Sequence, residues 1–375
     1  MVRMICDRPE RRADPMQISR QARATALQIK RALGNLWRAR VMDKDHILPY
    51  FSVYHANYVC NAGCQFCSQA ANIAAGKHQE VSLEEIWRIF NALRPLTPSL
   101  YIAGGEPLLQ RNIESIVELA RAMDFWPVAI NTNATLLHER PDVLRFADRI
   151  VVSIHAVEVA VAADIFQVPY RQIEGVFENI HDGAIEARRH GNQLVANCVL
   201  SAENIRSAHG VLDYCLEANI PLAIVPAVEN YWPTIERANS TQRVAYVQFV
   251  ERVIAQKRKD PKTIQGTVRY LERIRDFGSF DCRPTGMLVV DPHGRILNPC
   301  EYKYPALCDH IGKIATQRDA LNVLHAALNY NARFRPCQKL CLKACFVEPS
   351  LSVQAPLELA AEFVLPNWLR SFIST

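Results

Sequence analysis

The sequence has 375 residues, of which 49% are hydrophobic and 22% are charged. A chain of this length and composition can bury a large core, which excludes a disordered, fibrous or multi-span membrane protein. Its net charge of +5 is unevenly placed, because residues 1–45 carry eleven basic and five acidic side chains and the remainder is nearly neutral. The basic excess is confined to one N-terminal arm and no aromatic and basic groove is recognisable, so we expect no nucleic-acid partner.

The N-terminal arm, residues 1–48, is expected to form an amphipathic basic helix over residues 16–40. Its apolar positions recur at three- and four-residue steps and are Ile18, Ala22, Ala26, Ile29, Leu33, Leu36 and Trp37. Such a stripe usually packs against its own domain; the alternative is peripheral contact with an anionic membrane surface, such as the inner membrane face, or with a lipid substrate. The C-terminal tail, residues 351–375, is also apolar and leaves the same alternative open.

Residues 49–235 alternate short apolar runs with amphipathic stretches, which is typical of repeated βα units around a parallel sheet. The apolar runs are Tyr50–His55, Leu100–Ala103, Val128–Asn131, Ile150–His155, Leu194–Leu200 and Leu222–Val225. The helical stretches between them are Ser82–Leu93, Ile113–Met123, Pro141–Ala147, Arg171–Arg189 and Ala208–Ala218. The predicted fold class is α/β, a TIM-like (β/α)6 barrel, closed or open, with its chemistry at the carboxyl ends of the strands.

The alternation ends after Pro226. Residues 236–280 predict a helical connector, with two charged and solvated helices over 240–276. Residues 281–350 predict a small cysteine-rich domain, which contains a hairpin because Asp291–Gly294 is a turn signal between two apolar runs.

The sequence contains twelve cysteines, and its first residues lack the apolar segment of a secretory signal. We therefore expect a reducing, cytoplasmic setting, in which clustered cysteines serve metal or redox chemistry rather than disulfides. Cys198, in a predicted strand, and Cys215, in a predicted helix, stand alone and are expected to be packed apolar residues.

Cys60, Cys64 and Cys67 lie in the loop that follows the first predicted strand. Thiolates from one loop can bind one metal centre, but three of them leave a four-coordinate zinc or a cubane iron–sulfur cluster one ligand short. An exogenous ligand can complete the set, whereas a structural zinc site would need a fourth protein ligand such as His78.

The spacing C-x3-C-x2-C, with the aromatic Phe66 before the last cysteine, resembles the signature of the radical S-adenosylmethionine (SAM) enzymes. The second predicted strand ends in Gly104, Gly105, Glu106 and Pro107, which is similar to the GGEP motif of that family. The resemblance implies a [4Fe-4S] cluster on the three cysteines, SAM on its fourth iron, and the SAM amino group beside the glutamate. It also implies reductive cleavage of SAM to methionine and a 5'-deoxyadenosyl radical, which abstracts hydrogen from a substrate.

Polar side chains also occur at the ends of the next predicted strands. Asn131 and Asn133 end the third strand, and Ser153 and His155 belong to the fourth. Ser153 matches a serine common in the family, so the resemblance implies that it contacts SAM. The other three, together with Asn197, either bind SAM or substrate or satisfy buried backbone groups.

A second group of cysteines lies within residues 281–350, and its members are Cys282, Cys300, Cys308, Cys337, Cys341 and Cys345. Their arrangement resembles the SPASM/twitch extension of radical SAM enzymes, which implies an auxiliary [4Fe-4S] cluster. The spacing departs from the SPASM pattern after Gly294 and in the last cysteine run, so one cluster of the twitch kind is expected. Cys282 and Cys300 are its first expected ligands, and the remaining two are expected from among Cys337, Cys341 and Cys345, with Cys308 as a spare thiol. A four-thiolate zinc site is the alternative.

These features together predict an enzyme, an oxidoreductase or transferase, built as a partial (β/α)6 radical SAM barrel with a SPASM/twitch-like domain. We expect it to act on a small molecule or lipid and to take electrons from a flavodoxin- or ferredoxin-type donor. A peptide-modifying maturase is an alternative, although residues 1–49, which precede the first strand, are few for a leader-recognition domain. A non-catalytic iron–sulfur or zinc protein is the contrasting class.

Overall fold

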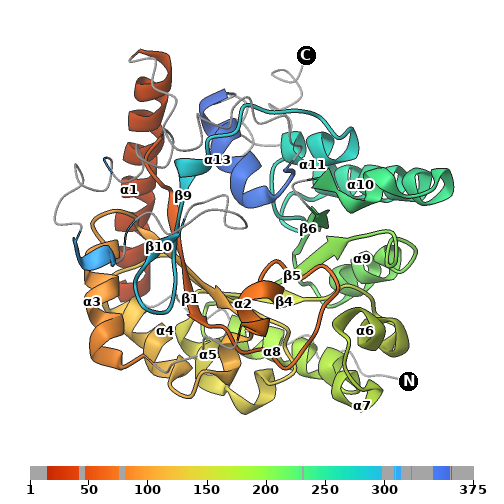
Figure 1. The fold of residues 1–375 in the computed structure, drawn as a ribbon, viewed down its shortest axis with the longest axis horizontal. Helices are drawn as coiled ribbons and strands as arrows, with labels where there is room; N and C mark the ends of the chain where they lie inside the picture. Colours follow the sequence, from red (N-terminus) through yellow and green to blue (C-terminus); the bar gives the residue numbers. More distant parts are fainter. Residues whose placement is uncertain are drawn as a thin grey trace.

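The computed structural model describes residues 15–41, 47–75, 81–229, 232–297, 308, 310–313, 322, 341–354 and 356. Its centre is a curved sheet in the order β10-β9-β1-β2-β3-β4-β5-β6 (Figure 1). These strands are β1 (Phe51–Asn57), β2 (Ser99–Gly104), β3 (Val128–Thr132), β4 (Arg149–Ser153), β5 (Gln193–Leu200), β6 (Leu222–Pro226), β9 (Met287–Val290) and β10 (Ile296–Leu297). A separate pair consists of β7 (Val228–Glu229) and β8 (Trp232–Pro233).

The strands β1 to β6 are parallel to their neighbours, which confirms the predicted α/β fold with a barrel of βα units. Among the described residues the end strands β6 and β10 do not pair with each other, so the barrel is open. Each of the six predicted strands ends within two residues of its predicted bounds. The largest differences at a strand's carboxyl end are two residues: β1 extends past the predicted His55 to Asn57, and the predicted Ile154 and His155 lie beyond the end of β4.

Helices cover the outer face of the sheet (Figure 1). Those of the βα units are α3 (Leu83–Leu93), α4 (Ile113–Ala122), α5 (Pro141–Phe146), α8 (Val176–Arg189) and α9 (Ala208–Glu217). The other α-helices are α1 (Pro15–Arg40), α2 (Ala70–Ala74), α6 (Val159–Phe166), α7 (Tyr170–Ile173), α10 (Ser240–Lys259), α11 (Val268–Arg275) and α13 (Ala344–Gln354). Short 3-10 helices are η1 (Pro107–Leu109), η2 (Leu137–Glu139), η3 (Thr234–Arg237), η4 (Pro284–Gly286) and η5 (Ile311–Lys313).

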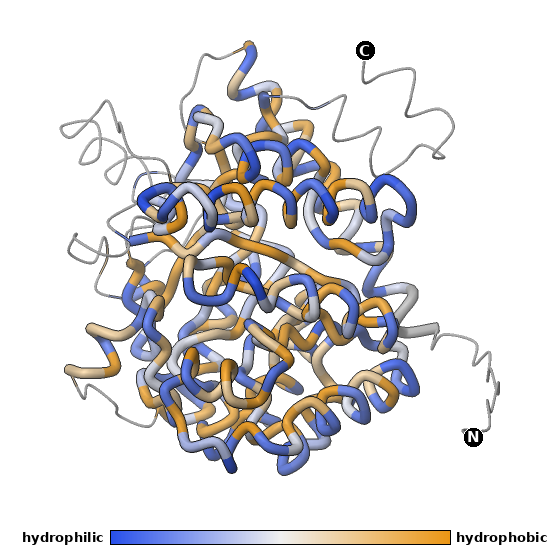
Figure 2. Tube along the Cα trace, turned by 90° about the vertical axis from the view of Figure 1, so that its right-hand side faces the viewer, coloured by the Kyte–Doolittle hydropathy of each residue, from blue (hydrophilic) through white to orange (hydrophobic). Residues whose placement is uncertain are grey.

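The main core lies between the sheet and its outer helices. Strand residues that point outward, such as Ile102, Ile130 and Val152, are fully buried against the helices. Hydrophobic and hydrophilic residues alternate along the helices, as expected for elements with one buried face (Figure 2). Cys198 and Cys215 are buried in this core, which confirms that they are packed residues.

The predicted helix Arg171–Arg189 is in fact two helices, α7 and α8. Gly175 interrupts it with a φ of 81°, a left-handed backbone conformation that glycine adopts without a steric penalty. The prediction missed this break because a single glycine inside a helical pattern is usually tolerated.

The prediction that the helices of the connector are solvated is wrong. Its two helices, α10 and α11, bury large side chains such as Tyr246, Phe249 and Tyr270 in the main core. They extend the core beyond β6, where Ile264 forms a bridge with Leu222. The hairpin after them is confirmed, and its first strand, β9, pairs in parallel with β1.

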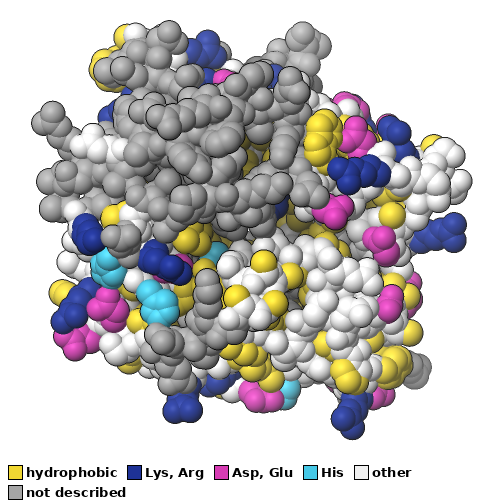
Figure 3. All heavy atoms as spheres, in the orientation of Figure 1, with side chains coloured by type: hydrophobic (Ala, Val, Ile, Leu, Met, Phe, Trp, Pro, Cys, Tyr) yellow, Lys and Arg dark blue, Asp and Glu magenta, His cyan; other side chains and the backbone are white. Residues whose placement is uncertain are grey.

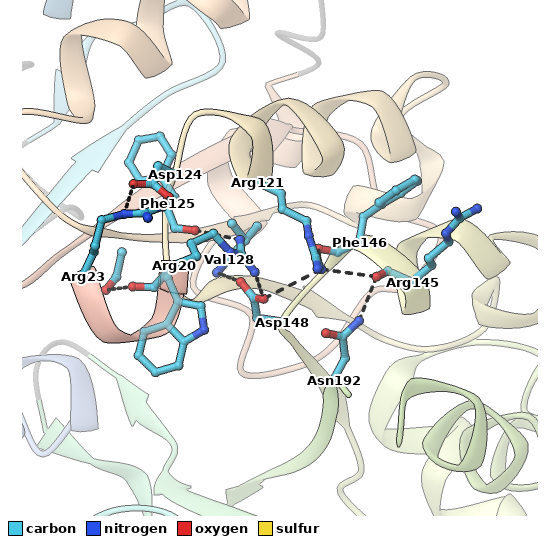
Figure 4. A network of polar contacts seen from close by, with 12 residues as sticks. Arg20, Arg23, Arg121, Asp124, Phe125, Val128, Arg145, Phe146, Asp148 and Asn192 are labelled. Atoms are coloured by element: carbon cyan, nitrogen blue, oxygen red, sulfur yellow. Dashed lines mark hydrogen bonds and ion pairs between the residues drawn. The ribbon is translucent and has the colours of Figure 1, made fainter. Parts of the chain in front are cut away.

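The basic helix α1 lies beneath the amino ends of the strands. Arg20 forms an ion pair with the buried Asp148 and donates a hydrogen bond to the Phe125 carbonyl oxygen at 3.0 Å (Figure 4). Asp148 also accepts a hydrogen bond from the Val128 amide at 2.8 Å. No helix among the described residues is long and apolar enough to span a membrane.

The expectation that the apolar stripe of α1 packs against its own domain is wrong. The buried residues on α1 are Arg20, Ala24 and Asn35, which face the barrel. Asn35 exchanges two hydrogen bonds with the backbone of Leu48, at 2.9 and 2.8 Å. The polar face therefore binds the strand ends, where backbone groups and Asp148 need partners, and the apolar stripe faces outward.

Several predicted features lie outside the described residues. These are Cys300, Cys337, His78 and residues 357–375 of the C-terminal tail.

Candidate active site

The three cysteines of the first motif lie in the loop between β1 and α2, at the carboxyl end of β1. Each thiol is half-buried, and the Cys67 amide donates a hydrogen bond to the Cys64 carbonyl oxygen at 3.1 Å. Burial raises the pKa of all three thiols. For Cys64 the pKa rises to about 12, because burial removes water from the thiol and because the other two sulfurs add negative charge beside it.

One side of this loop packs on a small apolar cluster. Cys64 and Phe66 contact buried side chains from α6 and the segment before it, including Ala163 and Phe166. This contact keeps one side of the thiols away from water, which raises the strength of electrostatic interactions at the site.

The donor set suits an iron–sulfur cluster. In the placement of the described residues, no three Cys, His, Asp or Glu side chains form a group that could hold a single metal ion. The ligands on the loop are nevertheless three soft sulfur donors within eight residues, a set that favours iron–sulfur clusters or zinc over hard cations such as magnesium. The three thiols also lie close enough for the charges of Cys60 and Cys67 to raise the pKa of Cys64.

Gly104 and Gly105 bring the end of β2 against the segment that leads into the cysteine loop. A Cβ on Gly105 would lie 2.1 Å from the Val59 carbonyl oxygen, and one on Gly104 would lie 2.4 Å from that of Asn57. The amides of Gly105 and Glu106 donate hydrogen bonds to the same two oxygens, at 3.0 and 2.7 Å. The glycines are therefore required for contact between two protein backbones, in addition to any approach to a ligand.

Glu106 is buried and connects the ends of β2 and β3. Its carboxylate accepts hydrogen bonds from the Leu108 amide, the Thr132 hydroxyl and the Asn133 amide, at 2.9, 2.7 and 2.7 Å. Loss of water raises the pKa of this carboxyl to about 7, although the three hydrogen bonds favour its charged form. The reading of this residue as a solvated turn glutamate is thus excluded.

Asn133 links the end of β3 to the cysteine loop. Its side chain donates a hydrogen bond to the Asn61 side chain at 2.8 Å and accepts one from the Thr135 hydroxyl at 2.7 Å. Asn61 in turn donates to Thr135 at 2.9 Å. Of the two roles considered for Asn133, these contacts correspond to the structural one. Thr132 and Asn61 were missed by sequence reasoning, which had no signal for contacts between separate loops.

The inner face of the sheet carries a row of polar side chains near the strand ends. Ser153 and Asn197 are direct neighbours in the β4–β5 register, and both side chains are half-buried. Neither side chain has a hydrogen-bond partner in the described part of the chain. Asn131, on β3, accepts a hydrogen bond from the Tyr101 hydroxyl at 3.2 Å. Ser153 and Asn197 are thus available to a bound molecule.

His155 is buried between the cysteine loop and α6. Its ring is flanked by Phe66 at 4.9 Å and Phe166 at 5.1 Å between ring centres. Its Nδ1 accepts a hydrogen bond from the Val199 amide at 3.2 Å, so the neutral ring carries its proton on Nε2. Burial lowers the pKa of His155 to about 3, which keeps the ring neutral.

Three of the described C-terminal cysteines lie together. Cys282, Cys341 and Cys345 pack against one apolar cluster on the inner face of the sheet, which includes Val53 and Phe346. This cluster is next to the first cysteine loop, because Lys343 lies close enough to lower the pKa of the Cys67 thiol. Cys308 lies apart from them and pairs with Ile296 at the end of the hairpin.

Arg149 is a further residue of the barrel interior that sequence reasoning missed. It begins β4 and lies on the same face as Ser153, because strand residues alternate between faces. Burial lowers its pKa, and its guanidinium has no hydrogen-bond or ion-pair partner within the described ranges. In the sequence, an arginine before an apolar run is an ordinary strand end. The inward position of Arg149 is therefore seen only in the structure.

Comparison with known proteins agrees with this geometry. Residues 56–207, which contain the cysteine loop, the glycine turn and the strands β2 to β5, match the family model described as the radical SAM superfamily. The match includes every residue of the first site described above.

Solved structures share the fold over most of the chain. Streptococcus suis SuiB bound to S-adenosylmethionine is 15% identical, with a TM-score of 0.57, and the alignment covers 81% of this chain and 74% of SuiB. SuiB bound to its precursor peptide SuiA is 14% identical, with a TM-score of 0.56, and 84% and 72% are covered. The anSMEcpe protein with bound AdoMet and Cp18Cys peptide is 16% identical, with a TM-score of 0.52, and 81% and 91% are covered.

The matched domain, the shared barrel and the cysteine loop at its mouth lead to one conclusion. Residues 56–207 of the chain form a domain of the radical SAM superfamily, whose members are enzymes that use a [4Fe-4S] cluster and S-adenosylmethionine.

Proposed function

We propose that this enzyme abstracts hydrogen from an organic substrate bound inside the open barrel, with Cys60, Cys64 and Cys67 as the ligands of its catalytic cluster. The observation that carries the proposal is the direct hydrogen bonding of the Gly105–Glu106 turn to the segment that leads into the cysteine loop. When bound, the cluster supplies the electron that splits SAM into methionine and a 5'-deoxyadenosyl radical, the species that removes hydrogen from the substrate.

Glu106 is proposed to receive the SAM amino group. Its carboxylate accepts three hydrogen bonds from the protein, and a carboxylate offers about four acceptor positions, so one is left for an ammonium donor. Those three bonds also fix its orientation, because they come from η1 and from both residues at the end of β3. An ammonium beside the carboxylate would favour its charged form.

Ser153 and Asn197 are proposed to contact SAM or the substrate, because both are inward polar side chains without a partner in the described structure. His155 has a positioning role in this proposal: its ring supports Phe66, and through it the turn between Cys64 and Cys67. The aromatic contacts exclude water from that side of the loop, which protects a reactive radical from side reactions.

An auxiliary [4Fe-4S] cluster is proposed on Cys282, Cys341 and Cys345, with Cys300 or Cys337 as the fourth ligand. The packing of the first three against one cluster of side chains supports this choice over a set that contains Cys308. Three protein ligands would leave an iron open to bind substrate, whereas four would favour a role in accepting the electron left after hydrogen abstraction.

The substrate is proposed to be a small molecule or lipid, with electrons supplied by a flavodoxin- or ferredoxin-type donor. Arg149, a half-buried cation on the inner face, supports an anionic group on that substrate. A peptide is the second candidate, supported by the likeness to SuiB bound to SuiA and to anSMEcpe with its peptide.

The experiment that tests the reaction class is anaerobic reconstitution with iron and sulfide, followed by assay for 5'-deoxyadenosine after dithionite addition. The wild-type protein should form the nucleoside, and Cys64→Ala should form none. Cys308→Ala is the matched control, since this half-buried thiol lies apart from both cysteine groups and its loss should leave the yield unchanged. A protein that binds only zinc, or forms no 5'-deoxyadenosine, would contradict the proposal.

The substrate class requires a second assay. Candidate small molecules, lipids and peptides carrying deuterium should be screened for transfer of the label into 5'-deoxyadenosine. Transfer from a peptide alone would replace the first candidate by the second.

A further inference from the structure

The outward face of α1 carries large apolar side chains that the protein leaves exposed. Ile29, Leu33, Trp37 and Val41 are exposed by 56, 63, 54 and 68%. They follow one another at four-residue steps, so they form one continuous stripe along the helix. The amide of Val41 donates a hydrogen bond to the Trp37 carbonyl oxygen, so the helical turn extends as far as Val41. Twelve residues of helix give this stripe a length of about 18 Å.

The stripe cannot turn inward while the opposite face of α1 is bound. That face is held by the ion pair of Arg20 with Asp148, a 2.7 Å hydrogen bond from Gln28 to the Ser99 hydroxyl, and the two bonds of Asn35. These contacts lie along the helix from its second to its sixth turn, and breaking them would leave buried polar groups without partners. The exposed stripe is therefore a fixed property of the folded protein. Hydrophobic side chains are visible over the upper end of α1 in Figure 3.

The charge of α1 defines what the stripe can contact. Residues 15–41 contain six Arg and Lys and no Asp or Glu. Lys30 and Arg38 have no hydrogen-bond or ion-pair partner in the described structure, and Arg40 donates only to neutral carbonyl oxygens of Val353 and Gln354. Within the part of the chain that the structure describes, Arg20 and Arg23 are the only basic residues of α1 that pair with carboxylates. The exposed side of the helix is thus both apolar and positively charged.

We infer that the outward face of α1 binds the surface of an anionic lipid bilayer. An apolar stripe with cations beside it can place its hydrophobic side chains among lipid chains and its basic side chains against anionic headgroups. A second copy of the chain fits less well, because two such helices would bring positive charge against positive charge with no acidic residue on either to compensate. This inference does not depend on the radical chemistry, since none of the residues involved belongs to the proposed site.

Vesicle flotation tests the inference on the anaerobically purified full chain. Wild type should float with vesicles of phosphatidylcholine and phosphatidylglycerol in equal parts, and bind pure phosphatidylcholine vesicles at least about tenfold more weakly. Trp37→Glu and Leu33→Glu should each weaken binding by at least about tenfold, because each places a charge where an apolar side chain would enter the lipid. Lys30→Glu combined with Arg38→Glu should also weaken it by more than about tenfold.

The matched control is Trp87→Glu. The exposed fraction of Trp87 is 48%, which is similar to the 54% of Trp37. Trp87 lies on α3, whose first turn is acidic, so this variant should bind as wild type does. Circular dichroism should give all variants the wild-type melting temperature, because the other changed side chains are exposed and the half-buried Arg38 has no partner in the described structure. No flotation of wild type, or equal losses in Trp37→Glu and Trp87→Glu, would overturn the inference. A lipid-free dimer that Trp37→Glu converts to monomer would overturn it in favour of a second copy.

Discussion

Two buried carboxylates, Asp148 and Glu106, lie at opposite ends of the barrel and are held in different ways. At the amino ends of the strands, Asp148 is paired with Arg20 from α1 and lies 3.9 Å from the Arg121 guanidinium. At the carboxyl ends, Glu106 accepts only hydrogen bonds from neutral groups among the described residues. The chain thus supplies a cation where the carboxylate serves the fold. Among the described residues it supplies none beside Glu106, where a cationic cofactor is proposed to bind.

This difference separates stability from ligand binding. A buried ion pair that lies within the protein is a structural requirement, because removing one partner leaves an unpaired charge in a dry environment. A buried carboxylate without a cation keeps a raised pKa until a cation arrives. Variants of the two carboxylates should therefore have separable effects.

The largest expected effect is on stability at the amino ends. Asp148→Ala should lower the free energy of unfolding by about 3–5 kcal/mol, because the buried Arg20 would lose its charged partner. Asp124→Ala is the control, since the Asp124–Arg23 pair is exposed and should contribute less than about 1 kcal/mol. Urea unfolding of both variants measures the difference. Similar losses would mean that burial does not distinguish the two pairs.

The next effect concerns the glycine turn at the opposite end. Gly105→Ala should lower the free energy of unfolding by about 2–4 kcal/mol and reduce iron incorporation, because its Cβ would overlap the Val59 carbonyl oxygen. The backbone of Val59 cannot yield without moving the cysteine loop. Thermal unfolding and iron analysis of the reconstituted protein measure both changes, and a variant with wild-type iron content would refute the link between this turn and the loop.

A smaller effect is expected for SAM binding. With a pKa of about 7, Glu106 changes charge near neutral pH, and its ionised form binds the SAM ammonium. SAM affinity of the reconstituted protein should therefore rise about tenfold from one pH unit below this pKa to one unit above it. Glu106→Gln should weaken binding by about tenfold and abolish this pH dependence. Glu118→Gln, an exposed glutamate on α4, is the control and should retain both. Equilibrium dialysis provides the measurement; a flat wild-type profile would argue against the proposed role.

The smallest effect returns to α1. Gly34 has no atom within 4 Å of the position that a Cβ would occupy, so Gly34→Ala should raise the free energy of unfolding by up to about 1 kcal/mol. The result is the opposite of that for Gly105→Ala, although the substitution is the same. Chemical denaturation of both variants in parallel tests whether the close backbone contact accounts for the difference.

The sequence predicted those parts of the fold that depend on local patterns. The six barrel strands are largely apolar runs with few charges, and the cysteine spacing and glycine turn are short motifs, so their positions are recognisable without a structure. The orientation of α1 was not recognisable, because it depends on Asp148, which lies 128 residues from Arg20. The hydrogen bonds of Asn133 to Asn61 and the inward position of Arg149 likewise depend on contacts between distant segments.

The pairing of β9 with β1 has a consequence for electron transfer. β1 leads into the first cysteine loop, and β9 follows Cys282 by a few residues, so the first group of thiols and Cys282 of the second are attached to neighbouring strands of one sheet. A metal centre that includes Cys282 is therefore held relative to the first group by the backbone hydrogen bonds between β1 and β9. Since the rate of electron tunnelling falls steeply with separation, such an arrangement would hold that rate constant while substrates enter and leave.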